Sequence, residues 1–526
     1  MRSVVLIPLL AAALSGALPG PGSASRAVTG YLREVPPESE AARAERLRRV
    51  AERRAGPVVV MVHRGASAAA PENSLEAYSA ALDLGADGCE VDVRRTADGV
   101  LVLFHDDMLD RLTNGFGTVP QLTYYELLSL KPRLGYGAGR GYRVPTFAAL
   151  LELARRRAML LHLDVKEPGL DAEIARMLDQ ARAWEHVVGV NVATAPDLAR
   201  DPRVKPLAYK GPGLFEGRRD LDPEAVRAQL ARPGAMVMVD DPRLVARELG
   251  RKPAALQPLP RDLTQRWEVN RAAVPTDAFG PSAFLRQLAA RVDPASPAAL
   301  LRVLSEASAA ERTEVDGSPE YACARTERIV ARAWAAQRLG ELGKKTPEIV
   351  RALEQEVRGR SLHRDWMYHG LDGAAAARTL GELGAVEAVP TLVDAFRRVD
   401  PALKKVANPE FGQYPLAWTD FRARMTIVPA LGELRSEAGR RFLLEYVRMD
   451  EAAARELGPP MWEEATRALF RHRLSSAEVA ELLRSRHSAV RGAAILECLD
   501  RPSRTRTAAL KAAHPWAAEL PRITPP

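Results

Sequence analysis

Residues 58–106 read VVVMVHRGASAAAPENSLEAYSAALDLGADGCEVDVRRTADGVLVLFHD. The stretch holds three short apolar runs that each end in polar residues, among them two histidines, an arginine and two carboxylates. An apolar run that closes on polar residues is typical of a buried parallel strand whose carboxyl end opens into a site. Barrel and doubly wound enzymes keep their chemistry at such strand ends. The stretch therefore predicts an α/β fold with a site built from several strands.

The two-residue period of a strand indicates which of these polar groups share a face. In the third run Leu101, Leu103 and His105 share one face, so an apolar stem carries an imidazole to the strand's end. In the second run Glu90 and Asp92 share a face. Two carboxylates held this close repel each other unless a cation lies between them.

Residues 159–166 form a further run of the same kind, with His162, Asp164 and Lys166 on one side. Together with the two carboxylates of the second run, Asp164 supplies acidic oxygen donors from separate strands. Such donors predict one hard divalent cation, Mg2+ or Ca2+, rather than zinc. His162 is expected one layer deeper, where a polar partner must satisfy it.

The polar residues of these runs occur in the order of a known family. The matching segments are His63-Arg64-Gly65, Pro71-Glu72-Asn73-Ser74, Gly85-Ala86-Asp87 with Glu90 and Asp92, Thr96, Asp98-Gly99, His105-Asp106, Leu109-Asp110-Arg111, Thr113-Asn114-Gly115, Gly117, Val144-Pro145-Thr146 and Asp164-Val165-Lys166. In these motifs the chain resembles the glycerophosphodiester phosphodiesterases. Any one motif is weak evidence, whereas so many in order are strong. The resemblance continues more thinly to about Lys252.

The resemblance implies a TIM barrel of eight parallel strands and a role for each matching polar residue. The implied roles are metal binding for Glu90, Asp92 and Asp164, acid and base catalysis for His63 and His105, and phosphate or substrate binding for Arg64, Lys166 and Glu72. The family usually has a glutamate where Asp164 stands, which leaves the identity of the metal open.

The activity that the resemblance implies is metal-dependent hydrolysis of glycerophosphodiesters to glycerol 3-phosphate and an alcohol. The nucleophile is either water or the substrate's own neighbouring hydroxyl, and the second route favours lyase-type cleavage of lysophospholipids through a cyclic phosphate. A third interpretation is a non-catalytic scaffold, in which the barrel is vestigial and the C-terminal region binds a protein.

The second half of the expected barrel, which spans residues 57–252, carries weaker signals. Its candidate strands are residues 186–191, 204–209 and 235–240. The stretch after Asp164 is short for four further strands at about thirty residues per strand and helix. Either the barrel is abbreviated or two of its strands are degenerate.

Residues 107–143, which follow the third run, are rich in Gly, Tyr and Arg. Long loops at the carboxyl face of a barrel usually shape access to the site. We expect this loop to overhang the site, with Phe116, Tyr124 or Tyr136 as a wall. The alternative is that these aromatics only pack the loop.

The N-terminal residues 1–24 combine Arg2, an apolar core and small residues, which is typical of a secretory signal peptide. The chain is therefore expected to be exported, to the periplasm or outside the cell, without a transmembrane span after cleavage. The alternative is an uncleaved membrane anchor, for which the apolar core is short. Residues 25–56 predict a solvated helix ahead of the barrel.

Residues 253–324 predict a linker with short helices, and residues 325–515 predict a HEAT-like α-helical repeat region. The sequence Leu-Gly-Glu-Leu occurs at 339–342, 380–383 and 431–434, the first two copies 41 positions apart. Its glycine is expected to let the two helices of a pair approach closely. Solenoids present a concave surface, so a protein partner is expected here. The alternative is a helical domain that only caps or dimerises the barrel.

The formal net charge of +8 favours anionic substrates or surfaces such as phospholipid headgroups. The basic residues are dispersed among acids, without a basic run interleaved with aromatics. Nucleic-acid binding is therefore excluded as an interpretation.

Overall fold

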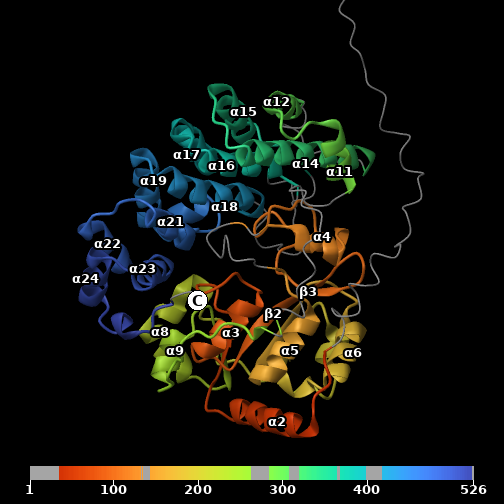
Figure 1. Cartoon of the computed structure of the whole chain (residues 1–526). Coiled ribbons are helices and arrows are strands. Elements are labelled where there is room, and N and C mark those ends of the chain that lie inside the picture. Colours follow the sequence, from red (N-terminus) through yellow and green to blue (C-terminus); the bar gives the residue numbers. More distant parts are fainter. Residues whose placement is uncertain are drawn as a thin grey trace, which may run out of the picture.

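The structure, a computed structural model, consists of an α/β part and a C-terminal helical part (Figure 1). It describes residues 35–131, 133, 143–261, 263, 283–306, 319–363, 368–398 and 417–523. The predicted signal peptide at 1–24 and Tyr136 lie outside these residues. Among the helices described, none combines the length and apolar composition that a membrane crossing needs.

Five parallel strands form the α/β sheet, in the spatial order β5-β4-β2-β1-β6. Their bounds are Val59–Val62 for β1, Gly88–Arg95 for β2, Leu160–Val165 for β4, Val187–Val190 for β5 and Met236–Val239 for β6. The register between β2 and β4 sets Asp92 opposite Asp164 and Glu90 opposite His162. Asp92 and Asp164 of the two neighbouring strands therefore lie at one level.

The chain at residues 207–210 links the two edge strands of this sheet. Leu207 N donates to Val188 O of β5 at 2.9 Å, and Lys210 N donates to Met236 O of β6 at 2.8 Å. The sheet thus returns on itself through β1, β2, β4, β5, this segment and β6. In the described residues the barrel wall therefore consists of five parallel strands and the segment 207–210, instead of the eight strands that the resemblance implies. The chain after β4 supplies few strands.

The third apolar run of the sequence is β3 (Leu101–Leu103), which lies outside this ring and pairs with β2. Its pairing is antiparallel, so the expectation of a parallel strand here is wrong. The connection from Arg95 to Leu101 turns at Gly99, whose φ is +77°. A parallel crossover needs about a dozen residues or more, so this short connection allows only a hairpin.

Helices cover the outside of the barrel (Figure 1). Their bounds are Leu75–Asp83 for α3, Phe147–Arg157 for α5, Asp171–Ala181 for α6, Pro196–Ala199 for α7, Pro223–Leu230 for α8 and Arg243–Glu248 for α9, whereas α4 (Tyr124–Ser129) belongs to the long loop after β3 and lies toward the helical part (Figure 1). The alternate residues of β1 divide between two cores: Val60 and Val62 pack under these helices, whereas Val59 and Met61 fill the barrel interior.

Helix α2 (Glu40–Arg54) lies at the amino end of the barrel, opposite the helical part (Figure 1). Its Val50 joins the interior core, and its Arg46 is buried against Glu38 and His186. The predicted helix is therefore present, but one of its faces closes the barrel rather than meeting solvent.

The helical part alternates between an inner and an outer row of helices. The bounds are Ala283–Arg291 for α11, Pro297–Ser305 for α12, Pro319–Glu341 for α14, Pro347–Arg358 for α15, Leu371–Glu382 for α16, Val389–Arg397 for α17, Ala417–Leu434 for α18, Glu437–Arg448 for α19, Glu451–Glu456 for α20, Trp462–Leu469 for α21, Ser476–Leu483 for α22, Ser488–Asp500 for α23 and Arg504–Ala513 for α24. The inner row is α14, α16, α18, α21 and α23, in which each helix packs on the next.

The glycines of the Leu-Gly-Glu-Leu motifs lie where consecutive inner helices meet. A Cβ on Gly381 of α16 would lie 2.9 Å from the Ala430 Cα of α18, and one on Gly432 of α18 would lie 3.0 Å from the Ala468 Cα of α21. The close approach is therefore between equivalent helices of successive pairs, not within a pair as expected.

The inner row contacts the barrel's loops along its length (Figure 1). Among the contacts that cross between the two parts are Gln337 with Arg133, Arg422 with Asp110, Glu463 with Arg218, Arg491 with Asp222, and Asp500 with Arg243. Met108 and Phe116 of the barrel's long loop lie in the core of the helical part. Phe116 therefore packs between the parts rather than forming a wall of the site, and the Tyr124 hydroxyl is buried on Val144 O.

Candidate functional site

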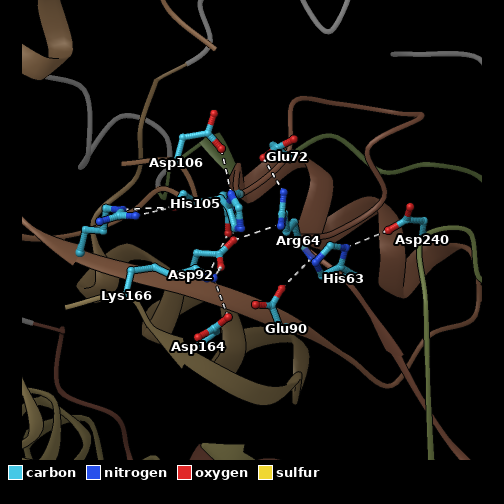
Figure 2. Close-up of polar contacts among 12 residues, drawn as sticks. His63, Arg64, Glu72, Glu90, Asp92, His105, Asp106, Asp164, Lys166 and Asp240 are labelled. Carbon is cyan, nitrogen blue, oxygen red and sulfur yellow. Dashed lines mark hydrogen bonds and ion pairs between the residues drawn. The ribbon is translucent and has the colours of Figure 1, made fainter. Parts of the chain in front are cut away.

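The polar residues predicted for the site lie together at the carboxyl ends of the strands (Figure 2). They are Glu90 and Asp92 on β2, Asp164 at the end of β4 with Lys166 after it, His63 and Arg64 after β1, His105 after β3, and Glu72 on the loop before α3. The structure thus brings together all the residues for which the resemblance implies a role.

Three carboxylates form a compact acidic cluster. Each of Glu90, Asp92 and Asp164 offers an oxygen within 4.8 Å of the others. Two amides hold these acids in place: Asn73 Nδ2 donates to Asp92 Oδ2 at 2.7 Å, and Asn191 Nδ2 donates to Asp164 Oδ1 at 2.9 Å. Oxygen donors at this spacing suit a hard divalent cation.

The electrostatics of the cluster also fit a cation. Burial, with Asp92 and Asp164 adding to it, raises the pKa of Glu90 well above its ordinary value despite Arg64 and Lys166. The protein's own cations therefore leave one carboxyl of the cluster short of positive charge. A bound divalent ion would supply that charge.

Lys166 and Arg64 lie beside the acids. Lys166 Nζ contacts Asp164 Oδ2 at 2.6 Å and Asp92 Oδ1 at 2.9 Å. Arg64 has a positive φ of 58°, and its backbone N donates to Glu90 Oε2 at 3.1 Å. This left-handed turn aims the Arg64 side chain toward Asp92, with Nε 3.4 Å from Oδ2. Both cations are therefore ion-paired with the acidic cluster.

His63 is oriented by a carboxylate of the last strand's loop. Its Nδ1 lies 3.0 Å from Asp240 Oδ1, and Phe215 stacks on its ring at a centroid distance of 4.3 Å. A carboxylate only accepts hydrogen bonds, so this contact assigns the proton to Nδ1 and leaves Nε2 as the basic nitrogen.

His105 has an equivalent partner in the next residue. Its Nδ1 lies 2.8 Å from Asp106 Oδ1, and Asp106 also pairs with Arg111 at 2.5 Å. Burial would raise the pKa of Asp106, but Arg111 and His105 overcome it and hold that pKa well below its ordinary value. Asp106 is therefore ionised whenever His105 needs a hydrogen-bond acceptor.

Glu72 lies between two arginines rather than facing an open position. Its Oε1 accepts from Arg64 at 3.3 Å and from Arg111 at 2.5 Å. This carboxylate therefore holds the Arg64 and Arg111 side chains beside each other. The expected role of Glu72 in binding phosphate or substrate stays a prediction.

His162 lies below the acidic cluster, as expected. Its Nδ1 is buried and has no hydrogen-bond partner within the described part of the chain, so the expected polar partner is absent there. Gly189 of β5 makes room for the ring, since a Cβ would lie 2.3 Å from His162 Cδ2. Tyr209 meets the ring edge-on.

Several residues of the site carry no role that the sequence alone predicts. They are Asp106, Arg111, Phe215, Arg218 and Asp240. Asp240 directly follows the apolar run 236–239, and Asp106 follows the run 101–104 with only His105 between them. A polar residue at the end of an apolar run is the signal that located the site. No comparable pattern marks Phe215 or Arg218, which reach the site from the connection between β5 and α8.

Comparisons with known proteins agree with the resemblance. Residues 63–192 match the sequence profile of the Glycerophosphoryl diester phosphodiesterase family. A glycerophosphodiester phosphodiesterase of Caldanaerobacter subterraneus is 35% identical over 136 residues, which are 25% of this chain and 56% of the relative. A probable glycerophosphodiester phosphodiesterase 1 of Mycobacterium tuberculosis is 52% identical over 84 residues, 16% of this chain and 29% of the relative.

Among solved structures, a glycerophosphodiester phosphodiesterase from Agrobacterium tumefaciens aligns with 26% identity and a TM-score of 0.30, covering 36% of this chain and 99% of that chain. The chain spans little more than half the length of the first of the curated relatives, 56%. Residues 63–192 therefore carry a domain of this family, and the helical part lies outside the match.

Proposed function

We propose that this protein, which carries the family domain at residues 63–192, is a metal-dependent phosphodiesterase that hydrolyses glycerophosphodiesters to glycerol 3-phosphate and an alcohol. One observation carries the proposal. Two histidines, each backed by a carboxylate, lie at the same strand ends as three carboxylates whose oxygens are within 4.8 Å of one another.

In the proposed reaction one histidine takes a proton from the water that attacks phosphorus. The other gives a proton to the alcohol oxygen as its bond to phosphorus breaks. Asp240 and Asp106 face the Nδ1 atoms of His63 and His105, so the Nε2 atoms remain for these transfers. Each transfer is worth roughly 10²–10⁴-fold in rate.

Glu90, Asp92 and Asp164 are the residues that would hold a divalent ion, Mg2+ or Ca2+. Such an ion supplies Lewis-acid stabilisation of the charge that grows on the phosphoryl oxygens. Lys166 and Arg64 would share that task by turning from the acids toward the substrate's phosphate.

We further propose that residues 1–24 direct export to the periplasm or the cell exterior and that the helical part is a HEAT-like array. The position of each Leu-Gly-Glu-Leu glycine at the contact between successive inner helices supports the array. A protein partner of the array would use the outer row, α15, α17, α19 and α22, because the inner row contacts the barrel.

The test is release of glycerol 3-phosphate from glycerophosphocholine by the mature chain with Mg2+, Ca2+ or EDTA, beside His63→Ala and Glu90→Gln. We expect metal-dependent release that both variants abolish, and binding of the metal alone, seen by calorimetry, that only Glu90→Gln weakens. A cyclic phosphate as the product would favour lyase-type cleavage instead. Metal binding without any turnover would favour a scaffold with a vestigial barrel.

A further inference from the structure

A chain of contacts connects the helical part to His63. His63 Nδ1 faces Asp240 Oδ1 at 3.0 Å. The other oxygen of Asp240 lies 3.4 Å from Arg218 Nη1, and Arg218 Nη2 donates to Glu463 Oε1 of α21 at 2.6 Å. Glu463, which lies outside the family domain, is thus connected to the His63 imidazole by three successive contacts.

Arg218 is held in place by the helical part through its backbone as well. It lies in the short helix η3 (Glu216–Leu221) with a positive φ of 57°. Helix α23 packs on η3 at Gly492, where a Cβ would lie 2.5 Å from the Arg218 Cβ and 3.2 Å from its carbonyl oxygen. The Arg218 side chain is 4% exposed, so it has little freedom to leave Asp240.

Glu463 provides the charge that Arg218 requires. Burial would raise the pKa of Glu463, but Arg218 and Arg467 overcome it and lower that pKa to about 2. Glu463 is therefore ionised throughout the range in which the protein works. A buried guanidinium deprived of such a partner would move toward the remaining acids, Asp240 and Asp220.

We propose that Glu463 is a positioning residue of the site: it fixes Arg218, which holds Asp240 with one oxygen toward His63. This inference rests on the proposed function. It makes the helical part a component of the site rather than an appended module.

The alternative is that Glu463 and Arg218 form only a stabilising ion pair between the two parts. The chain offers a matched control in Arg491 of α23, which pairs with Asp222 at 2.6 Å and is similarly half-buried. Asp222 caps the start of α8 through the backbone N of Glu224 and of Ala225. This second pair joins the same two parts without leading to a histidine.

The experiment compares Glu463→Gln, Glu463→Asp and Arg491→Gln in the full chain, with glycerophosphocholine as substrate. A misdirected general acid or base is costly, so we expect Glu463→Gln to lower kcat by about tenfold or more while KM stays within about twofold. Glu463→Asp should recover part of the loss because it keeps the charge. Arg491→Gln should keep kcat close to the wild-type value. Glu463→Gln and Arg491→Gln should both lower the melting temperature.

A double-mutant cycle with Asp240→Asn identifies the route. If Glu463 acts through Asp240, Glu463→Gln causes no further loss of kcat in the Asp240→Asn background. Equal kcat in Glu463→Gln and wild type, or an equal fall in Arg491→Gln, would overturn the inference. If Glu463→Gln does not fold, Glu463→Asp and the cycle built on it decide in the same way. Absence of turnover by the wild-type chain would instead overturn the proposed function itself.

Discussion

At the scale of single residues, the two histidines of the site differ from ordinary buried histidines in the hydrogen-bond partner of Nδ1. His63 and His105 each present Nδ1 to a carboxylate, at 3.0 and 2.8 Å. His186, by contrast, uses Nδ1 on the carbonyl of Met159 and lies at the other end of the barrel. A carboxylate stabilises the imidazolium that forms during proton transfer, whereas a carbonyl mainly holds the ring in place.

Asp106→Asn tests this arrangement at His105. The amide can present its NH2 group to Nδ1 and reverse the tautomer, so we expect kcat to fall by about 10²–10⁴-fold with little change in KM. The measurement is steady-state hydrolysis of glycerophosphocholine. The control is Asp98→Asn, since Asp98 accepts from Thr96 and Tyr124 but contacts neither histidine. A kcat within twofold of wild type for Asp106→Asn would show that Asp106 does not serve the reaction.

At the scale of elements, the glycine of the repeated motif explains why the inner helices stay in contact. A Cβ on Gly381 would meet backbone and Cβ atoms of Ala430 at 2.9 Å. Backbone cannot give way as the end of a flexible side chain does, so the two helices would have to separate.

Gly381→Val is therefore expected to lower the free energy of unfolding by about 1–3 kcal/mol, the usual cost of overpacking. Urea denaturation followed by circular dichroism measures it. Arg351→Val on α15 carries the same β-branched helix penalty at an exposed position, and it should cost less than about 1 kcal/mol. Similar losses in the two variants would contradict the close helix contact.

The cap that α2 forms on the barrel makes stability depend on pH. Burial lowers the pKa of His186 to about 4, from an ordinary value of 6.5, and Arg46 Nη1 lies 2.9 Å from its Nε2. The unfolded chain therefore binds a proton that the folded chain excludes between these values. This contribution to stability is complete above pH 6.5 and is lost as the pH falls toward 4.

His186→Asn removes the titrating group. Between pH 7 and pH 5 the wild-type chain should lose about 2 kcal/mol more unfolding free energy than the variant does. Urea unfolding at a series of pH values gives the two slopes. If the unfolding free energies of the wild type and the variant fell equally with pH, His186 would bind its proton equally well in the folded and unfolded chains.

The sequence predicts elements well where one local rule acts alone. The shared face of Glu90 and Asp92 along β2 follows from the strand period, whereas the register that sets Asp92 opposite Asp164 depends on how β2 pairs with β4. The direction of β3 depends on a turn, and the approach of Phe116 to the helical core depends on a contact between distant parts of the chain. Neither leaves a periodic signal. The role of Arg218 cannot be predicted from the sequence for the same reason, because its partner Glu463 lies in another part of the fold.

At the scale of the whole molecule, the barrel and the inner helical row share buried ion pairs. Arg243 of α9 is fully buried and pairs with Asp241 at 2.6 Å and with Asp500 of α23 at 2.7 Å. One turn further along α9, Arg247 pairs with Glu519 at 2.9 Å, but that pair is largely exposed. The two arginines therefore make contacts between the same parts in very different surroundings.

Arg243→Gln should lower the unfolding free energy by about 3–5 kcal/mol, because it leaves buried carboxylates without their cation. Arg247→Gln should cost at most about 1 kcal/mol. Differential scanning calorimetry distinguishes them, and we expect one cooperative transition for the wild-type chain. Two separated transitions in the wild type would show that the parts unfold independently. Equal losses of unfolding free energy in the two variants would contradict the larger role of the buried pair.

The attachment of the inner row at both of its ends has an evolutionary consequence. Helix α14 reaches the barrel's long loop through Gln337, and α23 reaches α9 through Asp500. Tandem arrays commonly gain or lose units by duplication and deletion, since each unit contacts only its neighbours. In the proposed HEAT-like array a change of copy number would shift the inner helices along the barrel and break the contacts at one end. The number of helix pairs in the proposed array should therefore vary far less than that of an array with free ends.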